Sequence, residues 1–238
     1  MFKNERHSQT APYFPTYMRV FHFVNEEFGL EDLRRHRLKI ATLHELNDPF
    51  EVFGVNLADE SLRRAFRVMK DELALKRGLL CFSRDWHNPV QWSHYAAKHT
   101  GLCLGFDIPD APDQILGAVT YSRKRLVVEA ERFRNPSEIP ADIAIRFLFT
   151  KYSHWRYENE VRCFVTIEDK DTEKNLYFAE FSEKLRLAVV IVGAESSVSR
   201  ETLRNALGDL EPNIQAFKAR LAFKTFRVVR QRNAKLWV

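Results

Sequence analysis

The stretch WSHYAAKHTGLCLGF, residues 92–106, joins a helical pattern to a strand pattern and decides the fold. Asn88-Pro89 before it is typical of an N-cap followed by proline at the first helical position, and Gly101 lies where such a helix should stop. The apolar run 102–106 then predicts a buried strand. A helix that passes directly into a buried strand indicates a fold that mixes the two kinds of element.

The helix predicted in this stretch carries polar aromatic side chains. At helical spacing Trp92, Tyr95 and His99 share one face, and His94 is rotated away from it. Such residues on one short element usually line a site, although a buried aromatic seam is the alternative reading. We therefore treat this helix as a candidate wall of a binding site.

Elsewhere, strand and helix patterns interleave without a regular βαβ alternation. Short apolar or alternating runs predict strands over residues 19–24, 38–41, 78–83, 118–121, 161–167 and 187–192, with further strands ending near Val229. Helical spacing predicts helices over residues 30–37, 59–76, 139–152 and about 200–207. These patterns favour an α+β fold with a mixed or antiparallel sheet and flanking helices. We expect a loose, polar N-terminal arm over residues 1–17 and a single domain over residues 18–238.

Composition is that of an ordinary folded protein. Of the 238 residues, 45% are hydrophobic and 13% aromatic, which excludes a disordered chain and suffices for a sizeable core. The net charge of +5 suits an anionic ligand or a nucleic acid, and equally an ordinary soluble surface. Because the N-terminus is charged and no apolar run reaches the length of a membrane span, we expect a cytoplasmic protein without membrane association. The oligomeric state stays open.

Several kinds of site have no counterpart in the sequence. The eight glycines are scattered, so they form no phosphate-binding loop. Cys81, Cys103 and Cys163 lie singly in apolar runs, which predicts reduced, buried thiols and not metal ligands. No histidine pair has zinc-protease spacing, and no serine has the glycine flanks of a hydrolase nucleophile.

The remaining candidates are polar residues on or beside predicted strands. His22 is flanked by two phenylalanines, so its side chain faces the opposite side from theirs, and Ser83 ends its strand. Glu158 and Glu160, two residues apart at the start of a strong strand, are expected to point the same way. Adjacent like charges need relief from a cation or a sugar hydroxyl, and Arg162 on the same face could supply it. A salt-bridge role and a catalytic role both stay open for this pair.

Four motifs, in this order, resemble one bacterial family. They are LNDPFE at 46–51, CFS at 81–83, WSHY with GLCLGF at 92–95 and 101–106, and WRYENEVR at 155–162. Over about residues 18–230 the chain is similar to the domain-of-unknown-function 2971 family, some of whose members are labelled abortive-infection proteins. The resemblance implies the family's fold and a connection with phage defence, but no established reaction.

A second resemblance is to the ADP-ribosyltransferases. Those enzymes place a His or Arg on the first strand, a Ser or Tyr on a middle strand or helix, and a Glu on a late strand, often as the second of a Glu-x-Glu pair. His22, then Ser83 or Tyr95, then Glu160 fill these places. The usual Ser-Thr-Ser triplet is missing, and the helix with Trp-Ser-His-Tyr is no feature of the transferase pattern. The resemblance implies an ADP-ribosyltransferase-like split-sheet core with NAD as the substrate.

The transferase resemblance also implies a role for each candidate residue. Cleavage of the bond between nicotinamide and ribose creates oxocarbenium-like charge, which Glu160, together with Glu158, would stabilise. His22 would bind the other ribose, and Tyr95 would stack on the nicotinamide ring. Further cofactor contacts are assigned to Arg19, for the pyrophosphate, and to Ser83, Trp92 and His94. The acceptor would be a nucleic acid or a protein.

Two other functions stay open at this stage. One is a metal-dependent nuclease, in which magnesium would be held by the carboxylates of Asp48, Glu51, Glu158 and Glu160. The Glu-x-Lys element common in restriction-type nucleases is absent from the late pair, which continues with valine and arginine. The other is a non-catalytic interaction module, antitoxin-like or a sensor, in which the motif residues mainly pack. Convergence of the three transferase residues on one cleft would favour the first function over these two.

Overall fold

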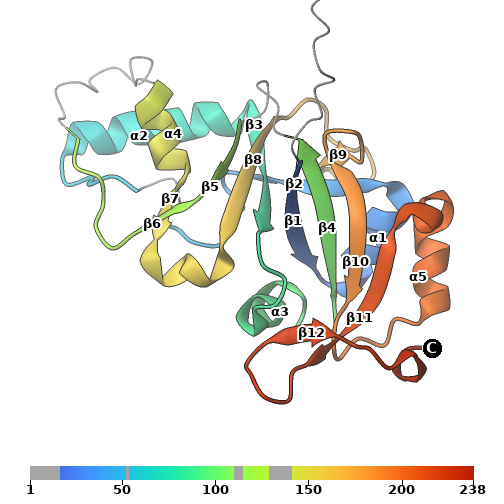
Figure 1. Ribbon diagram of the computed structural model, residues 1–238. Helices are drawn as coiled ribbons and strands as arrows, with labels where there is room; N and C mark the ends of the chain where they lie inside the picture. Colours follow the sequence, from blue (N-terminus) through green and yellow to red (C-terminus); the bar gives the residue numbers. More distant parts are fainter. Residues whose placement is uncertain (1–16, 52–53, 110–114, 129–140) are drawn as a thin grey trace, which may run out of the picture.

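The computed structural model describes residues 17–51, 54–109, 115–128 and 141–238 (Figure 1). The first part of the chain forms β1 (Tyr17–Val24), α1 (Glu26–Arg35), β2 (Arg37–Thr42), α2 (Glu60–Ala74), β3 (Arg77–Ser83), α3 (Pro89–Tyr95), β4 (Leu102–Pro109), β5 (Ile115–Ala118) and β6 (Thr120–Ser122). The arm expected over residues 1–17 lies outside the described residues, except that Tyr17 begins β1.

The second part of the chain also mixes helices and strands. It forms α4 (Ala141–Leu148), β7 (Thr150–Tyr152), η3 (Ser153–Glu158), β8 (Glu160–Thr166), β9 (Tyr177–Glu180), β10 (Arg186–Val192), α5 (Arg200–Leu207), η4 (Gly208–Asn213), β11 (Gln215–Leu221), β12 (Val228–Arg230) and η5 (Ala234–Leu236). The elements labelled η are 3-10 helices.

Within the described residues, ten strands form one mixed sheet, which confirms the α+β fold. The order is β12-β11-β10-β4-β1-β3-β2-β9, with β8 paired to β3 and β5 paired to β8. Most neighbours are antiparallel, but β10 and β11 are parallel. Strands β6 and β7 form a separate parallel pair.

The sheet divides along one edge of β3. Strand β1 pairs with β3 only at Phe21 and Ser83, and β2 pairs with its other end, at Gly78 and Leu79. The opposite edge of β3 pairs with β8 along its whole length. Because β1 and β2 lie on the same edge but pair with opposite ends, no strand in the described part of the chain pairs with the middle of that edge.

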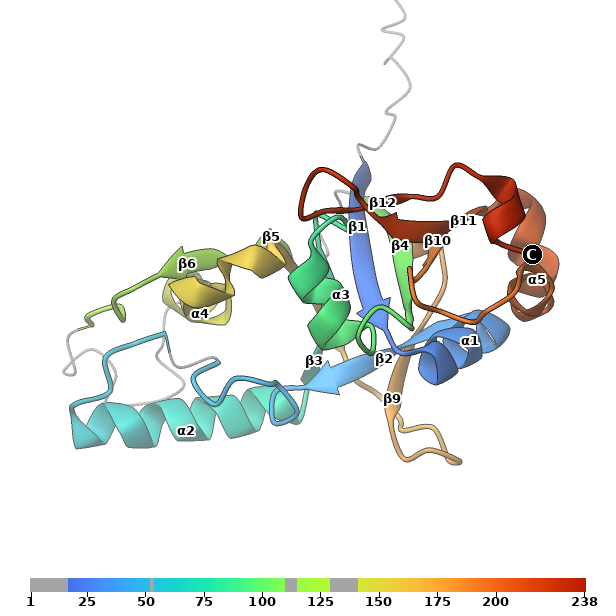
Figure 2. The same ribbon diagram turned by 90° about the horizontal axis from the view of Figure 1, so that it is seen from below.

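The helices cover different parts of the sheet, as Figure 2 shows, with α2 and α4 at one end of the molecule and α1 and α5 at the other. Leu33 of α1 and Leu203 of α5 join the main core with the sheet residues Leu104 and Val190. A separate cluster joins α2 to α4, where Phe66 and Phe147 meet edge to face at 4.7 Å between ring centroids. None of the helices in the described part of the chain has the length and apolar character needed to cross a membrane.

Helix α3 begins as predicted but ends early. The side chain of Asn88 accepts a hydrogen bond from the amide of Val90, and Pro89 occupies the first turn. The helix stops at Tyr95 because the next residues turn left-handed, with φ of 46°, 57° and 71° at residues 97–99. The prediction that it runs to Gly101 is therefore wrong. Gly101 is needed for close packing instead, since a Cβ there would lie 2.2 Å from the carbonyl oxygen of Val24.

The helix predicted over residues 139–152 is also too long. Helix α4 ends at Leu148, and β7 begins two residues later, with Thr150 Oγ1 donating to the carbonyl of Arg146. The apolar spacing could not show this end because the residues that follow are buried as well. The change from helix to strand at Thr150 directs Lys151 toward the sheet.

Candidate functional site

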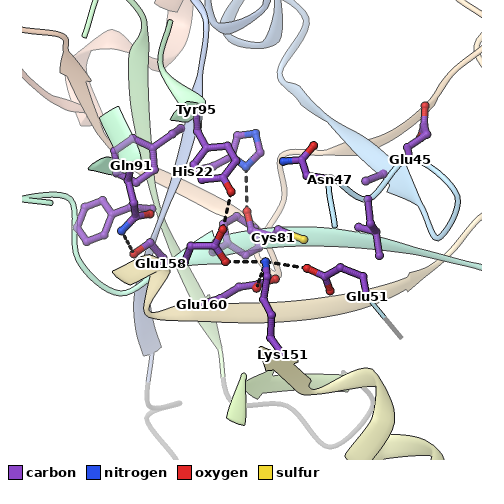
Figure 3. A pocket seen from close by; sticks show the side chains of 16 residues that line it. His22, Glu45, Asn47, Glu51, Cys81, Gln91, Tyr95, Lys151, Glu158 and Glu160 are labelled. Carbon is purple, nitrogen blue, oxygen red and sulfur yellow. Dashed lines mark hydrogen bonds and ion pairs between the residues drawn. The ribbon is translucent and has the colours of Figure 1, made fainter. Parts of the chain in front are cut away.

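A cavity of about 200 Å³ lies beside the unpaired edge of β3 (Figure 3). Its apolar lining includes three aromatic residues of β1 and β3, namely Phe21, Phe23 and Phe82. The polar side chains come from distant parts of the sequence and include His22, Ser83, Gln91, Tyr95, Lys151, Glu51, Glu158 and Glu160. The cavity therefore collects most of the candidate residues in one place.

Lys151 lies among three carboxylates on one side of the cavity (Figure 3). Its Nζ is 2.6 Å from Glu158 Oε2, 2.7 Å from Glu51 Oε1 and 3.1 Å from Glu160 Oε2. The lysine side chain is only 9% exposed, so water screens these ion pairs weakly. Trp155 covers the ammonium group at 5.0 Å from its ring centroid. Lys151 is thus held rigidly as the centre of the cluster.

Arg162 binds two of the same carboxylates from beneath the cavity. Its Nε is 2.7 Å from Glu160 Oε1, its Nη2 pairs with Glu51, and its Nη1 donates to the carbonyl of Leu148 at 2.6 Å. The predicted relief of the Glu-x-Glu pair by Arg162 is therefore present for Glu160. Three carboxylates face two cations in this cluster, so one negative charge is left over beside the cavity.

The two glutamates of the pair have opposite electrostatic behaviour. Burial alone would raise the pKa of Glu160, but the charges and hydrogen bonds of Arg162 and Lys151 outweigh it and lower the pKa to about 2. Burial raises the pKa of Glu158, and Lys151 offsets this only in part. Of the two groups, Glu160 is therefore the one that stays ionised most firmly.

The local geometry of the pair differs from the prediction. Glu158 ends the 3-10 helix η3, and β8 begins only at Glu160, with Asn159 between them in a left-handed conformation at φ 45°. The two carboxylates consequently do not share one strand face. They converge because both reach toward Lys151 from successive elements.

Tyr95 joins α3 to this cluster. Its hydroxyl donates to Glu158 Oε1 at 2.5 Å, and its ring lies partly exposed at the cavity. Burial and the bond to Glu158 raise the pKa of the hydroxyl, so it remains a proton donor. Tyr95 is therefore fixed at the cavity by a specific hydrogen bond to Glu158.

His22 spans the gap between β1 and β3. Its Nδ1 lies 3.0 Å from the carbonyl oxygen of Cys81, at the part of β3 that has no strand partner on this edge. Burial lowers the pKa of the imidazole, and the bond to Cys81 counteracts this less strongly. In the neutral ring Nδ1 must carry the hydrogen to donate to a carbonyl, so Nε2 is left as an acceptor.

Ser83 is part of the wall but already has hydrogen-bond partners. Its Oγ accepts from Gln91 Nε2 at 2.9 Å and from the amide of Asp85 at 3.0 Å. It also lies directly opposite Glu160 in the pairing of β3 with β8. Ser83 thus links α3 to the strand that carries the ionised glutamate.

Three predicted cofactor contacts lie away from the cavity wall. Trp92 is fully buried, its Nε1 donates to the carbonyl of Trp86 at 2.6 Å, and its ring packs on Phe23. His94 is exposed and bonds through Nδ1 to the hydroxyl of Tyr157 at 3.0 Å. Arg19 is paired with Asp107. Trp92 is therefore part of a buried aromatic seam, which was the alternative to a site wall.

The carboxylates proposed as magnesium ligands already have partners within the protein. Asp48 Oδ2 accepts from Trp155 Nε1 at 2.8 Å, and its Oδ1 accepts from the amide of Phe50, so it shapes a turn. Glu51, Glu158 and Glu160 are bound to the two cations described above. In the described parts of the chain, no three His, Cys, Asp or Glu side chains form a group that could hold a metal ion. The donor set does not fit a metal-dependent nuclease.

Sequence reasoning missed Lys151 altogether and assigned Glu51 only to the magnesium hypothesis. Lys151 fell inside the predicted helix that ends at Leu148 in the structure. The one signal for it was the charge balance, since two buried carboxylates cannot be relieved by Arg162 alone.

One comparison with known proteins found a family model that matches part of the chain. The model of the family described as "Protein of unknown function (DUF2971)" matches residues 91–163, which supports the resemblance found from the motifs. The matched segment contains Tyr95, Lys151 and Glu160, and it leaves out His22 and Glu51. No curated protein and no solved structure matched the chain.

Proposed function

We propose that the chain is an ADP-ribosyltransferase-like enzyme that binds NAD in this cavity and cleaves the bond between nicotinamide and ribose. The observation that carries the proposal is that His22 of β1, Tyr95 of α3 and Glu160 of β8 line a single cavity. These are the residues that fill the transferase pattern in the sequence. The division of the sheet between β1 and β3 agrees with the split-sheet core that the resemblance implies.

The electrostatics of the cavity suit this chemistry. Positive charge develops at the anomeric carbon as nicotinamide leaves, and a fixed negative group stabilises it by about 3 kcal/mol or more. The cluster has one more carboxylate than cations, and Glu160 is held ionised with a pKa of about 2. In the proposal, Glu160 stabilises the developing charge and accepts a hydrogen bond from a ribose hydroxyl.

The remaining groups would hold and orient the substrate. Because the cavity has room for one ribose, Nε2 of His22 would accept from a hydroxyl of the nicotinamide ribose and not of the other ribose. Phe21, which is only half-buried, would take the stacking role that the resemblance assigns to Tyr95. Tyr95 would position Glu158 through its hydroxyl. At about 200 Å³ the cavity is below the roughly 300–1,000 Å³ of typical ligand pockets. We therefore expect it to take the nicotinamide-ribose half of NAD, with the rest outside.

A second, basic cavity could take the pyrophosphate in place of Arg19. It measures about 280 Å³, shares Lys151 with the first cavity, and is lined by Arg123, Lys124 and Arg125. All three basic residues are exposed. Arg and Lys side chains are the usual partners of phosphate groups, so this cavity is our candidate for the negative part of the substrate.

The biological setting of the proposal rests on the resemblance alone. It is that of a bacterial, toxin-like effector in phage defence, with ADP-ribose passing to a nucleic-acid or protein acceptor, or to water.

A non-catalytic interaction module is the second candidate, and one observation favours it. Both carboxylate oxygens of Glu160 already bond to Lys151 or Arg162. A cluster that ties β7 and β8 to the loop before α2 has an obvious structural use. In that function Glu160 would stabilise the fold and turn over no NAD.

Nicotinamide release separates the two candidates. The full chain is incubated with NAD, and free nicotinamide is measured for the wild type, for Glu160→Gln and for Glu183→Gln, which changes an exposed glutamate elsewhere. The proposal predicts release by the wild type and by Glu183→Gln, and a loss of at least about 100-fold in Glu160→Gln. Thermal melting of all three accompanies the assay. No release by the wild type, with a lowered melting temperature in Glu160→Gln, would favour the interaction module.

A further inference from the structure

The C-terminal segment of the chain has a strongly one-sided charge. Residues 215–238 contain seven Lys and Arg residues, at 218, 220, 224, 227, 230, 232 and 235, and no Asp or Glu. The whole chain has 37 Lys and Arg against 32 Asp and Glu, so this segment accounts for the entire positive excess. Five of its basic residues are exposed: Lys224, Arg227, Arg230, Arg232 and Lys235. We call the surface formed by β11, β12, their connecting loop and residues 231–235 the basic hairpin surface.

Two aromatic rings project from the loop of this surface. Phe223 is 92% exposed and Phe226 is 96% exposed, and both lie in the loop between β11 and β12. The guanidinium of Arg220 lies 4.6 Å from the ring centroid of Phe223. Exposed rings beside cations mark a binding surface, because water solvates the ring faces poorly.

A polar groove lies at the end of the hairpin away from the loop, where β11 begins and β12 ends. It measures about 500 Å³, and its basic lining residues are Arg200, Lys218, Arg230 and Arg232. In the described part of the chain, the only ion pair of the basic hairpin surface joins Arg227 to Asp85, at 4.0 Å. Arg200 and Lys218 donate to the carbonyls of Trp237 and Ser196, so Arg230 and Arg232 are the groove cations that are available to an external anion.

The surface lies beside the helix that contributes to the cavity. The amide of Val228 donates to the carbonyl of His87 at 2.8 Å, and His87 Nδ1 lies 2.7 Å from the carbonyl oxygen of Val228. His87 comes just before α3, which carries Tyr95. Figure 1 shows the loop between β11 and β12 next to α3.

We infer that the basic hairpin surface binds single-stranded nucleic acid. Proteins that bind single strands combine a positive groove that follows the phosphates with aromatic rings on which bases stack. Both features are present, with Phe223 and Phe226 at the tip and Arg230 and Arg232 along the groove. A membrane surface would also attract aromatic and basic residues at the tip, but it would not require further cations in a groove at the other end of the hairpin. The inference goes beyond the proposed function and does not require NAD cleavage.

Fluorescence anisotropy with a labelled 20-nucleotide oligothymidylate tests the inference on the full chain without NAD. We expect saturable binding that weakens with salt. Phe223→Ala with Phe226→Ala should weaken it at least about fivefold through lost stacking. Arg230→Ala with Arg232→Ala should also weaken binding. Each phosphate contact on a single strand contributes about 0.7 to the slope of log affinity against log salt concentration, so the loss of two contacts should reduce that slope by about 1.4. The matched control, Arg34→Ala with Arg67→Ala, removes two exposed arginines elsewhere and should leave binding unchanged.

Three outcomes would overturn the inference: no binding of the oligonucleotide, equal loss in the control and the test variants, or binding only to vesicles that contain anionic lipid. The nicotinamide assay is run on the same variants. Because none of the changed residues lines the NAD cavity, nicotinamide release should persist in all of them. Failure of this inference and failure of the proposed function are thus read from separate measurements.

Discussion

His22 on β1 donates through Nδ1 to the carbonyl of Cys81 on β3, at 3.0 Å, where no backbone pairing joins the two strands. The side chain therefore replaces a missing hydrogen bond of the sheet and at the same time lines the cavity. Structure and proposed function depend on the same ring, so variants of His22 should affect both.

Replacement of His22 by alanine should lower stability and NAD binding together. It leaves the Cys81 carbonyl without a partner in a partly buried place, which costs about 1–3 kcal/mol. It also removes the acceptor proposed for the ribose hydroxyl. Thermal denaturation and the KM for NAD check this, with His44→Ala, an exposed histidine, as the control. An unchanged KM for NAD in folded His22→Ala would remove His22 from the binding site.

Stability should decrease on the acid side of neutrality because of His22. Burial lowers its pKa below 6.5. As the pH falls, His22 is therefore protonated in the unfolded chain first and in the folded chain only at a lower pH. The contribution of neutral His22 is complete above pH 6.5 and is lost as the pH falls through the folded pKa. Melting temperatures between pH 8 and pH 5 measure it. His22→Ala should show a flatter pH dependence than the wild type over this range.

Lys151→Met should destabilise the protein strongly, since it leaves three carboxylates with Arg162 alone. Breaking a buried pair by removing one partner costs about 3–5 kcal/mol. Adding Glu158→Gln removes one of the unpaired charges, so the double variant should be less destabilised than the sum of the two single variants. Denaturant unfolding of the wild type, the two single variants and the double variant measures this double-mutant cycle. Lys76→Met, at an exposed site, is the control. Additive losses would mean that Lys151 and Glu158 do not interact.

Arg123→Ala with Arg125→Ala should raise the KM for NAD while leaving kcat nearly unchanged. Both residues line the second cavity, and neither touches the ion cluster of the first. Loss of two phosphate contacts that act equally in the ground and transition states affects only binding. Steady-state kinetics check this, with Arg34→Ala and Arg67→Ala as the control pair. A fall in kcat at constant KM would contradict a purely binding role.

The sequence was sufficient for most strands and for the starts of α2, α3 and α5, because these depend on local rules, whereas α1 begins at Glu26, four residues before the predicted start. Alternation around His22 located β1, and Asn88-Pro89 located the start of α3. The ends of helices were harder to predict from the sequence. No local sequence pattern predicted the left-handed turn after Tyr95, which brings Gly101 against the backbone of Val24.

The candidate site was predicted in part. The sequence singled out His22, Tyr95 and Glu160, which line the cavity, because their residue types stand out on strands or a short helix. Lys151 was missed because its role depends on where α4 ends and on three carboxylates brought together from distant positions. Trp92 was assigned to the site because a pattern of aromatic residues cannot tell a cavity wall from a core seam.

A crystal structure of the full chain with a carbocyclic NAD analogue, in which a carbon replaces the ribose oxygen and prevents cleavage, tests the central claim most directly. We predict that the nicotinamide ring lies against the phenylalanines of the cavity, with a ribose hydroxyl within hydrogen-bond distance of Glu160 and another within reach of His22 Nε2. An analogue bound elsewhere on the protein, or a cavity that stays closed to it at saturating concentration, would contradict the account.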